Sequence, residues 1–373
     1  MSEIDLLPAM IVAFMVTAAF MLALRPVAKS VGLIDHPGGH KAHIGDVPIV
    51  GGMAMFGGVF AGLILLHGPG EILLSLFVAS VILVLIGVLD DRYGVLASVR
   101  LATQVAVVLI MVYGGGLQLL TIGDPFGFGE ISMGPFSLIV TVVVSVTVIN
   151  AYNLVDGIDG LAGALALIAF LAVAVLTGAG SMPGTIALTI AAGIVGFLLC
   201  NFPVIWNRPV RSFMGDAGST FLGFTIVWVA LSISQGPERV ISPVHCLWFA
   251  AIPIYDSMTC FVRRSLAGKS PFNSGRDHFH HILKRGGLGV RNSLGVLTGL
   301  QLIYAIAGLI AHYVGLADVM MFGAWAVLGL SQRRIIWKIA AYTRLSIRRR
   351  AETQPDLTAA PARTAVLKQK IAA

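Results

Sequence analysis

The sequence predicts an all-α polytopic membrane protein, and three observations carry this prediction. Hydrophobic residues make up 57% of the 373 residues. Charged residues make up 12%, about half of the share found in soluble globular chains. Apolar runs of about 20 residues, enough for a helix to cross about 30 Å of hydrocarbon, recur along the chain. Disordered, collagen-like and disulfide-based architectures are excluded, because apolar content is high, glycine has no triplet period and only 3 cysteines are present.

Eleven apolar runs are candidates for membrane-spanning helices. In chain order they cover residues 6–25, 49–67, 72–89, 101–118, 136–152, 161–178, 184–202, 219–235, 241–262, 293–312 and 316–332. We expect the first run to be a retained helix, because the acidic Glu3 and Asp5 precede it where a signal peptide carries basic residues.

The basic residues predict the orientation of these helices, because Lys and Arg concentrate in cytoplasmic loops. With the N-terminus outside, 24 of the 25 Lys and Arg residues fall on the inner side, and Arg239 alone falls outside. The C-terminus is then cytoplasmic. Residues 1–335 are expected to form one polytopic transmembrane domain with its polar loops inside. Residues 336–373 are expected to form a basic cytoplasmic tail with a disordered end.

Two adjacent carboxylates, Asp90 and Asp91, end the third run. Neighbouring carboxylates repel each other unless a cation or a shared proton relieves them, which makes the pair a candidate for metal binding or general base catalysis. A solvated helix end beside Arg92 and Arg100 explains a lone pair of this kind as well. The pair by itself leaves both interpretations open.

A second polar group follows the fifth run, in the segment NAYNLVDGIDGLAG. Asn153, Asp156 and Asp159 recur every three residues, which places oxygen ligands along one side of a helix. The glycines beside them allow the backbone to approach a bound ligand closely. Helix capping is the alternative, because Asn and Asp are also preferred at helix N-termini.

The segment SFMGDAGSTFLGF lies where an inner loop enters the eighth run. Free backbone N–H groups and the helix dipole at such a position attract phosphate. Asp216 adds a carboxylate, a ligand that Mg²⁺ accepts together with substrate phosphates. Helix capping alone also accounts for Asp216.

Three histidines, His278, His280 and His281, lie in the largest inner loop. A zinc site is disfavoured, because no cysteine is near in the sequence and the spacing suits tetrahedral closure poorly. With Arg276 and the following basic residues, diphosphate binding is the simpler interpretation. Contact of a basic loop with anionic lipid is the alternative.

The predicted topology brings the four polar groups to one membrane face, at the ends of helices. This arrangement suits an amphiphilic substrate whose phosphate lies at the interface while its tail stays in lipid. A transporter is the alternative from another class. The sequence disfavours it, because carriers place their sites near the midplane, and only Asp256 falls within a predicted helix close to that depth.

Five ordered motifs between about residues 31 and 290 resemble the polyprenyl-phosphate N-acetylhexosamine-1-phosphate transferases of glycosyltransferase family 4. They are VGLIDHPGGHKAHIGDVPIVGG, DDRYGVLASVRLATQ, NAYNLVDGIDGLAG, SFMGDAGSTFLGF and PIYDSMTCFVRRSLAGKSPFNSGRDHFHHIL. The interrupted histidines of RDHFHHIL are similar to the WecA type, and the MraY type carries an unbroken triplet. Arg100 stands where many relatives carry Lys.

The resemblance implies transfer of N-acetylglucosamine 1-phosphate from UDP-GlcNAc to undecaprenyl phosphate, with release of UMP, at the start of a cell-envelope polysaccharide. It implies Mg²⁺ or Mn²⁺ as cofactor and the bacterial inner membrane as location, with the active site on the cytoplasmic face. No nucleic-acid partner is expected, and the outer face of the bundle is compatible with a homodimer. The alternative within the family is another UDP-N-acetylamino sugar as donor.

Site roles follow from the same resemblance. Four carboxylates are expected to be catalytic: Asp90, Asp91, Asp156 and Asp159. Asp216 is expected to ligate the metal, together with Asn153 or Asp156. Substrate binding is expected from Lys41, His43, Arg100, Asn207, Phe213, Arg276, His278, His280 and His281. Two mechanisms remain open: direct attack by the lipid phosphate, and a covalent aspartyl intermediate.

Overall fold

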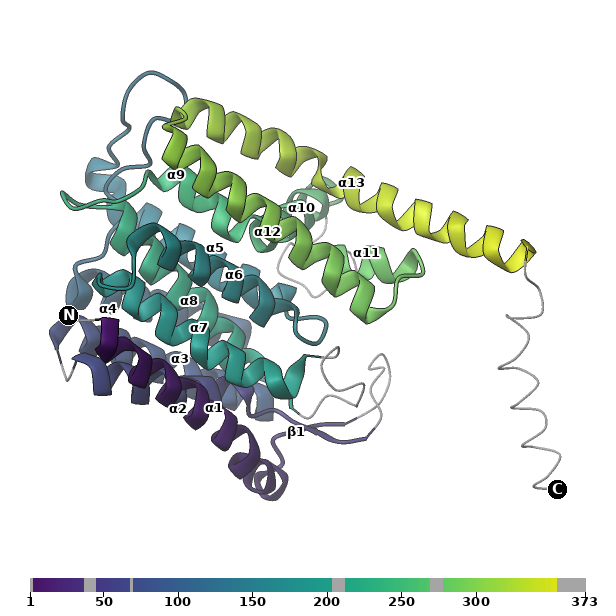
Figure 1. The fold of residues 1–373 in the computed structure, drawn as a ribbon, viewed down its shortest axis with the longest axis horizontal. Helices are drawn as coiled ribbons and strands as arrows, with labels where there is room; N and C mark the ends of the chain where they lie inside the picture. The colour runs from purple at the N-terminus through teal and green to yellow at the C-terminus, as the bar shows by residue number, and fades with distance from the viewer. Residues whose placement is uncertain (1–2, 37–44, 68–69, 203–211, 269–277, 354–373) are drawn as a thin grey trace.

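The computed structural model describes residues 3–36, 45–67, 70–202, 212–268 and 278–353. Lys41, His43, Asn207 and Arg276 lie outside the described residues. In these described residues the chain folds into a bundle of helices with one short hairpin, which confirms the predicted all-α membrane class (Figure 1). In order, the elements are α1 (Glu3–Val31), β1 (Ile34–Asp35), β2 (Val47–Pro48), α2 (Gly51–His67), α3 (Glu71–Tyr93), α4 (Ala97–Gly115), η1 (Gly134–Phe136), α5 (Ser137–Val155), α6 (Leu161–Thr177), α7 (Met182–Asn201), α8 (Gly215–Ser234), α9 (Pro243–Cys246), η2 (Leu247–Ala250), α10 (Ala251–Leu266), α11 (Phe279–Arg285), α12 (Val290–Val314) and α13 (Asp318–Thr353).

Seven helices in the described part of the chain are long and apolar enough to cross a membrane. The seven segments are Leu6–Val31, Leu73–Tyr93, Ala97–Gly115, Gly134–Val155, Met182–Asn201, Gly215–Ser234 and Val290–Val314. Two shorter apolar helices, Gly51–Leu66 and Leu161–Thr177, match further predicted runs. The protein is therefore a multi-pass membrane protein, whereas the total of eleven crossings and the placement of the termini remain predictions.

The ninth predicted run, residues 241–262, is not one continuous helix. It is divided into α9, the 3₁₀ turn η2 and α10. Backbone groups freed at such a break must find partners away from water. The buried side chain of Gln301 on α12 supplies them: its Oε1 accepts from the N–H of Ile252 at 2.9 Å, and its Nε2 donates to the carbonyls of Trp248 and Phe249 at 3.1 and 2.8 Å.

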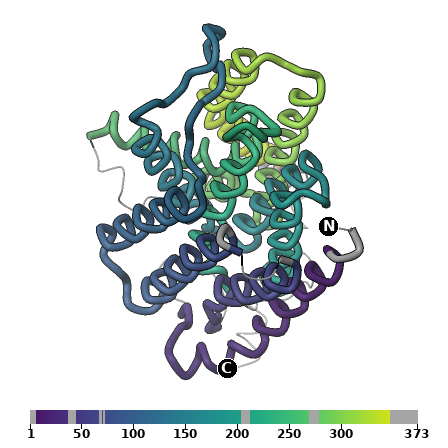
Figure 2. Tube along the Cα trace, turned by 90° about the vertical axis from the view of Figure 1, so that its left-hand side faces the viewer, coloured from purple at the N-terminus to yellow at the C-terminus, as the bar shows by residue number. Residues whose placement is uncertain are grey.

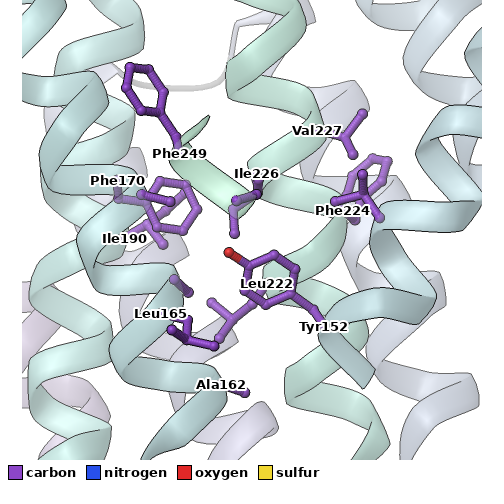
Figure 3. Close-up of a cluster of buried hydrophobic side chains, with 14 of the residues drawn as sticks. Tyr152, Ala162, Leu165, Phe170, Ile190, Leu222, Phe224, Ile226, Val227 and Phe249 are labelled. Atoms are coloured by element: carbon purple, nitrogen blue, oxygen red, sulfur yellow. The ribbon is translucent and has the colours of Figure 1, made fainter. Parts of the chain in front are cut away.

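Helix α8 occupies the centre of the bundle and packs against α2, α3, α5, α6 and α7. The apolar segment of α8 is 83% buried, the highest share among the seven candidate spans. Leu222 and Ile226 of α8 lie beside apolar side chains of α5, α6 and α7 in the cluster of Figure 3, whereas Phe224 points to another side of α8. Close packing of α3 on α8 requires Gly87, because a Cβ there would collide with the backbone of Ala217. The N-terminal end of α8 is thereby fixed among its neighbours.

The two ends of the bundle differ. The hairpin of β1 and β2, the C-terminal end of α7 and the short helix α11 lie at one end, on the right in Figure 1, and the start of α1 lies at the other. Figure 2 shows the purple first helices on one side of the bundle and the yellow-green α12 and α13 on the opposite side. Between them the helices do not follow chain order, because α7 packs against α1 and α2. A parallel bridge between Ile49 and Phe213 joins the hairpin to the segment before α8.

Candidate active site

A cavity lies beside the N-terminal end of α8 and is lined by side chains of α3, α4, α5 and α8. Its lining residues are Leu83, Ile86, Gly87, Asp90, Arg100, Thr103, Gln104, Asn150, Asn153, Asp216 and Thr220. Three of the four polar groups predicted from the sequence contribute to it. Sequence segments more than 100 residues apart therefore meet at one site.

Arg100 joins two of the predicted carboxylates. Its Nη1 donates to Asp90 Oδ2 at 2.6 Å and to Asp216 Oδ2 at 3.0 Å. The other oxygen of Asp90 accepts from the backbone N–H of Val95 at 2.6 Å. The Asp90 carboxylate is thus held between the loop after α3 and the guanidinium on α4. Arg100 therefore pairs with one carboxylate at the C-terminal end of α3 and with another at the N-terminal end of α8.

Asp91 occupies a different position from Asp90. Its Oδ1 accepts from the backbone N–H of Asp216 at 2.9 Å, and its Oδ2 lies 3.4 Å from the N–H of Ala217. These are free donors of the first turn of α8, which an acceptor side chain normally satisfies from within the same chain segment. Asp91 therefore caps α8 from another helix and fixes the direction in which Asp216 points.

Removal of this cap should lower both stability and activity. We expect Asp91→Ala to lower the free energy of unfolding by about 1 kcal/mol and to reduce transfer strongly, because Asp216 loses its support. Ser181→Ala is the matched control, since Ser181 caps α7 by accepting from the N–H of Gly184. Melting in detergent and transfer assays on both variants check the prediction. Equal loss of activity in the two variants would contradict it.

Asn153 connects α5 to α8. Its Nδ2 donates to Asp216 Oδ1 at 2.9 Å and to Ser219 Oγ at 3.1 Å. Asp156 follows one turn later, where α5 ends. Burial raises the pKa of Asp156 to about 8, and the nearby negative charges of Asp216, Asp159 and Asp91 add to the shift. Several acidic groups thus share one small region, where a bound cation would relieve their repulsion.

The turn between α5 and α6 is tied to the segment before α8. The buried Asn201 at the end of α7 accepts from the N–H of Gly160 at 2.7 Å through Oδ1 and donates from Nδ2 to the carbonyl of Ser212 at 2.8 Å. Asp159 lies half-buried on this turn, and half-buried Phe213 follows Ser212. Asp159 and Phe213, which are predicted catalytic and substrate-binding residues, are therefore on segments joined by Asn201.

Asn201 and the buried Gln104 are site residues that were not predicted from the sequence. Gln104 and Asn150 exchange amide contacts across α4 and α5, with Asn150 Nδ2 donating to Gln104 Oε1 at 2.7 Å. The sequence did contain a signal for this pair, because Gln104 and Asn150 are amides in two predicted membrane helices, and such side chains need polar partners in lipid. Asn201 gave a weaker signal, because a polar residue at a helix end is common.

The histidine segment forms the start of α11. His278 Nδ1 lies 2.9 Å from Asp256 Oδ2, and the Asp256 hydrogen bond raises the pKa of His278 to about 10 against the effect of burial. The ring of His280 packs on the turn after α5, where a Cβ at Gly157 would collide with it. His281 lies beside it, with ring centroids 4.1 Å apart. This group therefore contacts the Asp156 turn.

His280 is the histidine best placed to meet a ligand. Its side chain is 2% exposed, and among the described residues neither ring nitrogen has a hydrogen-bond partner. Burial lowers the pKa of His280 to about 2, and the charges of His281, His278 and Lys284 lower it further, so the ring is neutral. A neutral imidazole offers one donor and one acceptor to a polar ligand.

One other feature concerns metal binding. Within the described parts of the chain, the only three side chains of the His, Cys, Asp and Glu types with ligand atoms within 4.8 Å of one another are Asp256, Cys260 and His278. The aspartates around Asp216 do not form a three-ligand cage of that kind. Mg²⁺ does not need one, since it is usually held by one or two carboxylates together with substrate phosphates.

Fold and site together define a class: a polytopic helical membrane protein with a site of carboxylates, amides, arginine and histidine at one end of the bundle. The model of glycosyl transferase family 4 matches residues 73–234. The undecaprenyl-phosphate alpha-N-acetylglucosaminyl 1-phosphate transferase of Escherichia coli (strain K12) is 35% identical over 359 residues, 92% of this chain and 96% of the relative. The enzyme of the same name from Pasteurella multocida (strain Pm70) is 34% identical over 93% of this chain and 98% of its own length. The chain belongs to glycosyl transferase family 4, which confirms the resemblance seen in the motifs.

Proposed function

We propose that the protein transfers N-acetylglucosamine 1-phosphate from UDP-GlcNAc to undecaprenyl phosphate and releases UMP. The observation that carries this proposal is the convergence of Asp90, Arg100, Asn153 and Asp216 at one end of an apolar bundle. Relatives that share most of the chain's length carry the name of this activity. A polar site at a helix end suits a phosphate on a lipid tail.

The reaction requires one bond to form and one to break. An oxygen of the lipid phosphate attacks the β-phosphorus of UDP-GlcNAc, and the bond from that phosphorus to the bridging oxygen breaks, so UMP leaves with the oxygen. Catalysis of such a transfer consists mainly of positioning and charge stabilisation. Arg100 is suited to hold the attacking phosphate or the transferring group, because its guanidinium offers several donors in one plane. Asp90 orients Arg100.

The contacts of the aspartate pair favour direct attack over a covalent aspartyl intermediate. A carboxylate nucleophile needs a free oxygen facing the phosphorus. Both oxygens of Asp90 accept bonds at 2.6 Å, and both oxygens of Asp91 face backbone N–H groups of α8. In this proposal Asp90 and Asp91 orient other groups, and the lipid phosphate is the nucleophile.

A divalent cation, Mg²⁺ or Mn²⁺, fits the donor set around Asp216. Asp216, Asn153 and Asp156 offer hard oxygen atoms. Burial is the largest cause of the raised pKa of Asp156, and the negative charges of Asp216, Asp159 and Asp91 add to it. We assign these three residues to the cation. When bound, the cation supplies neutralisation of diphosphate charge.

The donor is assigned to the turn after α5 and the histidine helix. Asp159 and Phe213 are the proposed uridine contacts, and the ring of Phe213 offers a stacking face. His280 and His281 are proposed to contact the sugar or the diphosphate. Lys41, His43, Asn207 and Arg276, together with the catalytic role of Asp156 and Asp159, remain proposals taken from the family resemblance.

Loss of the His280 ring should weaken use of the donor. We expect His280→Ala to raise the KM for UDP-GlcNAc about tenfold, the value of one hydrogen bond to a charged or polar ligand, with little change in the KM for undecaprenyl phosphate. His312→Ala is the control. His312 lies in the last turn of α12, whereas the histidine segment precedes the first turn of that helix. Wild-type donor kinetics in His280→Ala would contradict this assignment and favour the alternative, contact of the histidine segment with anionic lipid.

The topology belongs to the same proposal. Eleven crossings, an outer N-terminus and a cytoplasmic C-terminus place the site on the cytoplasmic side of the bacterial inner membrane, where UDP-sugars are found. Residues 1–335 form the transferase domain and 336–373 the tail. A homodimer remains compatible with the outer face.

A panel of UDP-N-acetylamino sugars tests the proposed function. Purified protein with undecaprenyl phosphate should release UMP fastest from UDP-GlcNAc. Faster release from a fucosamine or quinovosamine derivative would move the chain to another donor within the family. Absence of lipid-dependent UMP release with every donor would favour the transporter.

A further inference from the structure

Asp256 is a buried carboxylate outside the cavity beside α8. It lies on α10 and is 1% exposed. Its Oδ2 lies 2.9 Å from Nδ1 of His278, and its Oδ1 accepts from the backbone N–H of Phe279 at 2.8 Å. Phe279 is the first residue of α11. Asp256 thus pairs with the residue before α11 and also satisfies a free N–H of its first turn.

The other end of α11 is held by α13. Gly286, the residue after α11, packs on Ala340, and Arg344 donates from Nη2 to the carbonyl of Arg285. Between these two ends, Ile282 and Leu283 are fully buried. A helix of only seven residues has little stability alone, so these contacts determine where it lies.

The position of α11 decides where His280 points. His280 follows Phe279 directly, and its ring packs on Gly157 in the turn that carries Asp156. A displacement of α11 by about 1 Å would move the His280 ring relative to that turn, and misplacement of this size can cost on the order of 100-fold in rate.

We propose that Asp256 is a positioning residue of the donor site, which anchors His278 and the start of α11 so that His280 and His281 face the turn after α5. The proposal rests on the proposed function, because it assigns the histidine helix to the donor. Asp256 acts through α11 and touches no substrate. The carboxylate of Asp256 also favours the charged form of His278, because it raises the pKa of that ring.

The same side chains admit a second interpretation, a metal site formed by Asp256, Cys260 and His278, with Cys260 Sγ 3.6 Å from His278 Nδ1. The hydrogen bonds already satisfy both oxygens of Asp256, which favours the anchor. Zinc content of the purified protein separates the two interpretations. One equivalent of zinc that disappears in Cys260→Ser would overturn the anchor.

Two variants of Asp256 and one matched control test the anchor. Asp256→Asn keeps an acceptor for the N–H of Phe279 and removes the charge, whereas Asp256→Ala removes both. Asp318→Asn is the control, because Asp318 also holds a loop, accepting from Ser242 Oγ at 2.6 Å and from the N–H of Asp124 at 2.9 Å, at the other end of the bundle.

We expect Asp256→Ala to lower kcat/KM for UDP-GlcNAc by on the order of 100-fold, with Asp256→Asn closer to the wild type. The KM for undecaprenyl phosphate should stay within about twofold in both. Asp318→Asn should leave donor kinetics unchanged even where it lowers Tm. Wild-type donor kinetics in Asp256→Ala, or parallel losses for donor and acceptor, would overturn the proposal. If Asp256→Ala does not fold, the zinc content of the wild type and the pH dependence of Tm in Asp256→Asn decide whether the anchor stands.

Chemical modification of His280 tests the anchor without an activity assay, so its result does not depend on the proposed function. Diethylpyrocarbonate modifies accessible neutral imidazoles, and His280 is buried and neutral. The reagent should leave His280 unmodified in the wild type and in Asp318→Asn, and should modify it in Asp256→Ala, as peptide mass spectrometry would show. Equal protection in all three would overturn the anchor, whether or not UMP is released.

The pH dependence of stability gives a further check. The pKa of His278 is raised, so its pairing stabilises the fold fully below the ordinary histidine pKa of about 6.5 and loses this effect as pH rises through about 10. The other titratable groups that face it are Cys260, His280 and His281. The Tm difference between the wild type and Asp256→Asn should therefore be larger at pH 6 than at pH 10. A difference that grows with pH would contradict the ion pair.

Discussion

Asp216→Ala should abolish nearly all transfer, with a loss of kcat on the order of 1,000-fold, while the protein still inserts and folds. Asp216 is the point where Arg100 and Asn153 meet, and its backbone N–H binds Asp91. The alanine variant keeps that N–H and the helix cap, so the fold of α8 should persist. UMP release in membranes containing the variant measures the effect.

Asp216→Asn makes the comparison sharper. Asparagine keeps the size and hydrogen-bonding reach of the side chain and loses the charge that the cation requires. It should therefore be almost as inactive as alanine. Asp318→Asn serves as the control for loss of a carboxylate at a distance from the site. Near-normal transfer by Asp216→Asn would show that the charge of Asp216 is not needed, and would remove the cation assignment.

Arg100→Ala should give the second large loss, on the order of 100-fold in kcat. Its removal leaves Asp90 and Asp216 without the guanidinium that joins them. Arg100→Lys should recover part of the activity, because an ammonium keeps the charge but cannot offer the planar set of donors. Steady-state transfer assays on the two variants measure the difference.

Arg92→Ala is the matched control for Arg100. Arg92 is exposed, lies one residue after the aspartate pair and stacks over the ring of Tyr93, with 5.2 Å between its Cζ and the ring centroid. Its loss removes the same charge from the end of α3, a few residues before Arg100 at the start of α4. No hydrogen bond or ion pair of Arg92 with Asp216 is found among the described residues. Equal losses in Arg92→Ala and Arg100→Ala would show that net charge at this end matters and that the Arg100 bridge does not.

Much of the fold could be predicted because hydrophobicity and length decide it. A run of about 20 apolar residues must form a helix in lipid, since its backbone has no other way to satisfy its hydrogen bonds. The division of residues 241–262 could not be predicted in this way. It depends on Gln301, about 50 residues away, which supplies the hydrogen bonds that the break removes.

The sequence predicted most of the residues that form the site. It did not predict what each of them contacts. Polar groups at helix ends on one predicted face identified Asp90, Asn153 and Asp216 as neighbours, and the structure brings them together. The sequence could not separate Asp90 from Asp91, because the difference lies in which tertiary partner each carboxylate meets. Asp256 appeared as an isolated charge in a helix, and only its contact with α11 indicates what it does.

In the proposed reaction a sugar phosphate, and not a sugar alone, moves to a lipid phosphate at the site around Asp216. UDP-GlcNAc labelled with ³²P in the β-phosphate tests it most directly, with purified protein and undecaprenyl phosphate. The predicted result is label in the lipid product, unlabelled UMP in solution, and neither with Asp216→Ala. Label that remains in released UDP, or transfer that persists in Asp216→Ala, would contradict the claim.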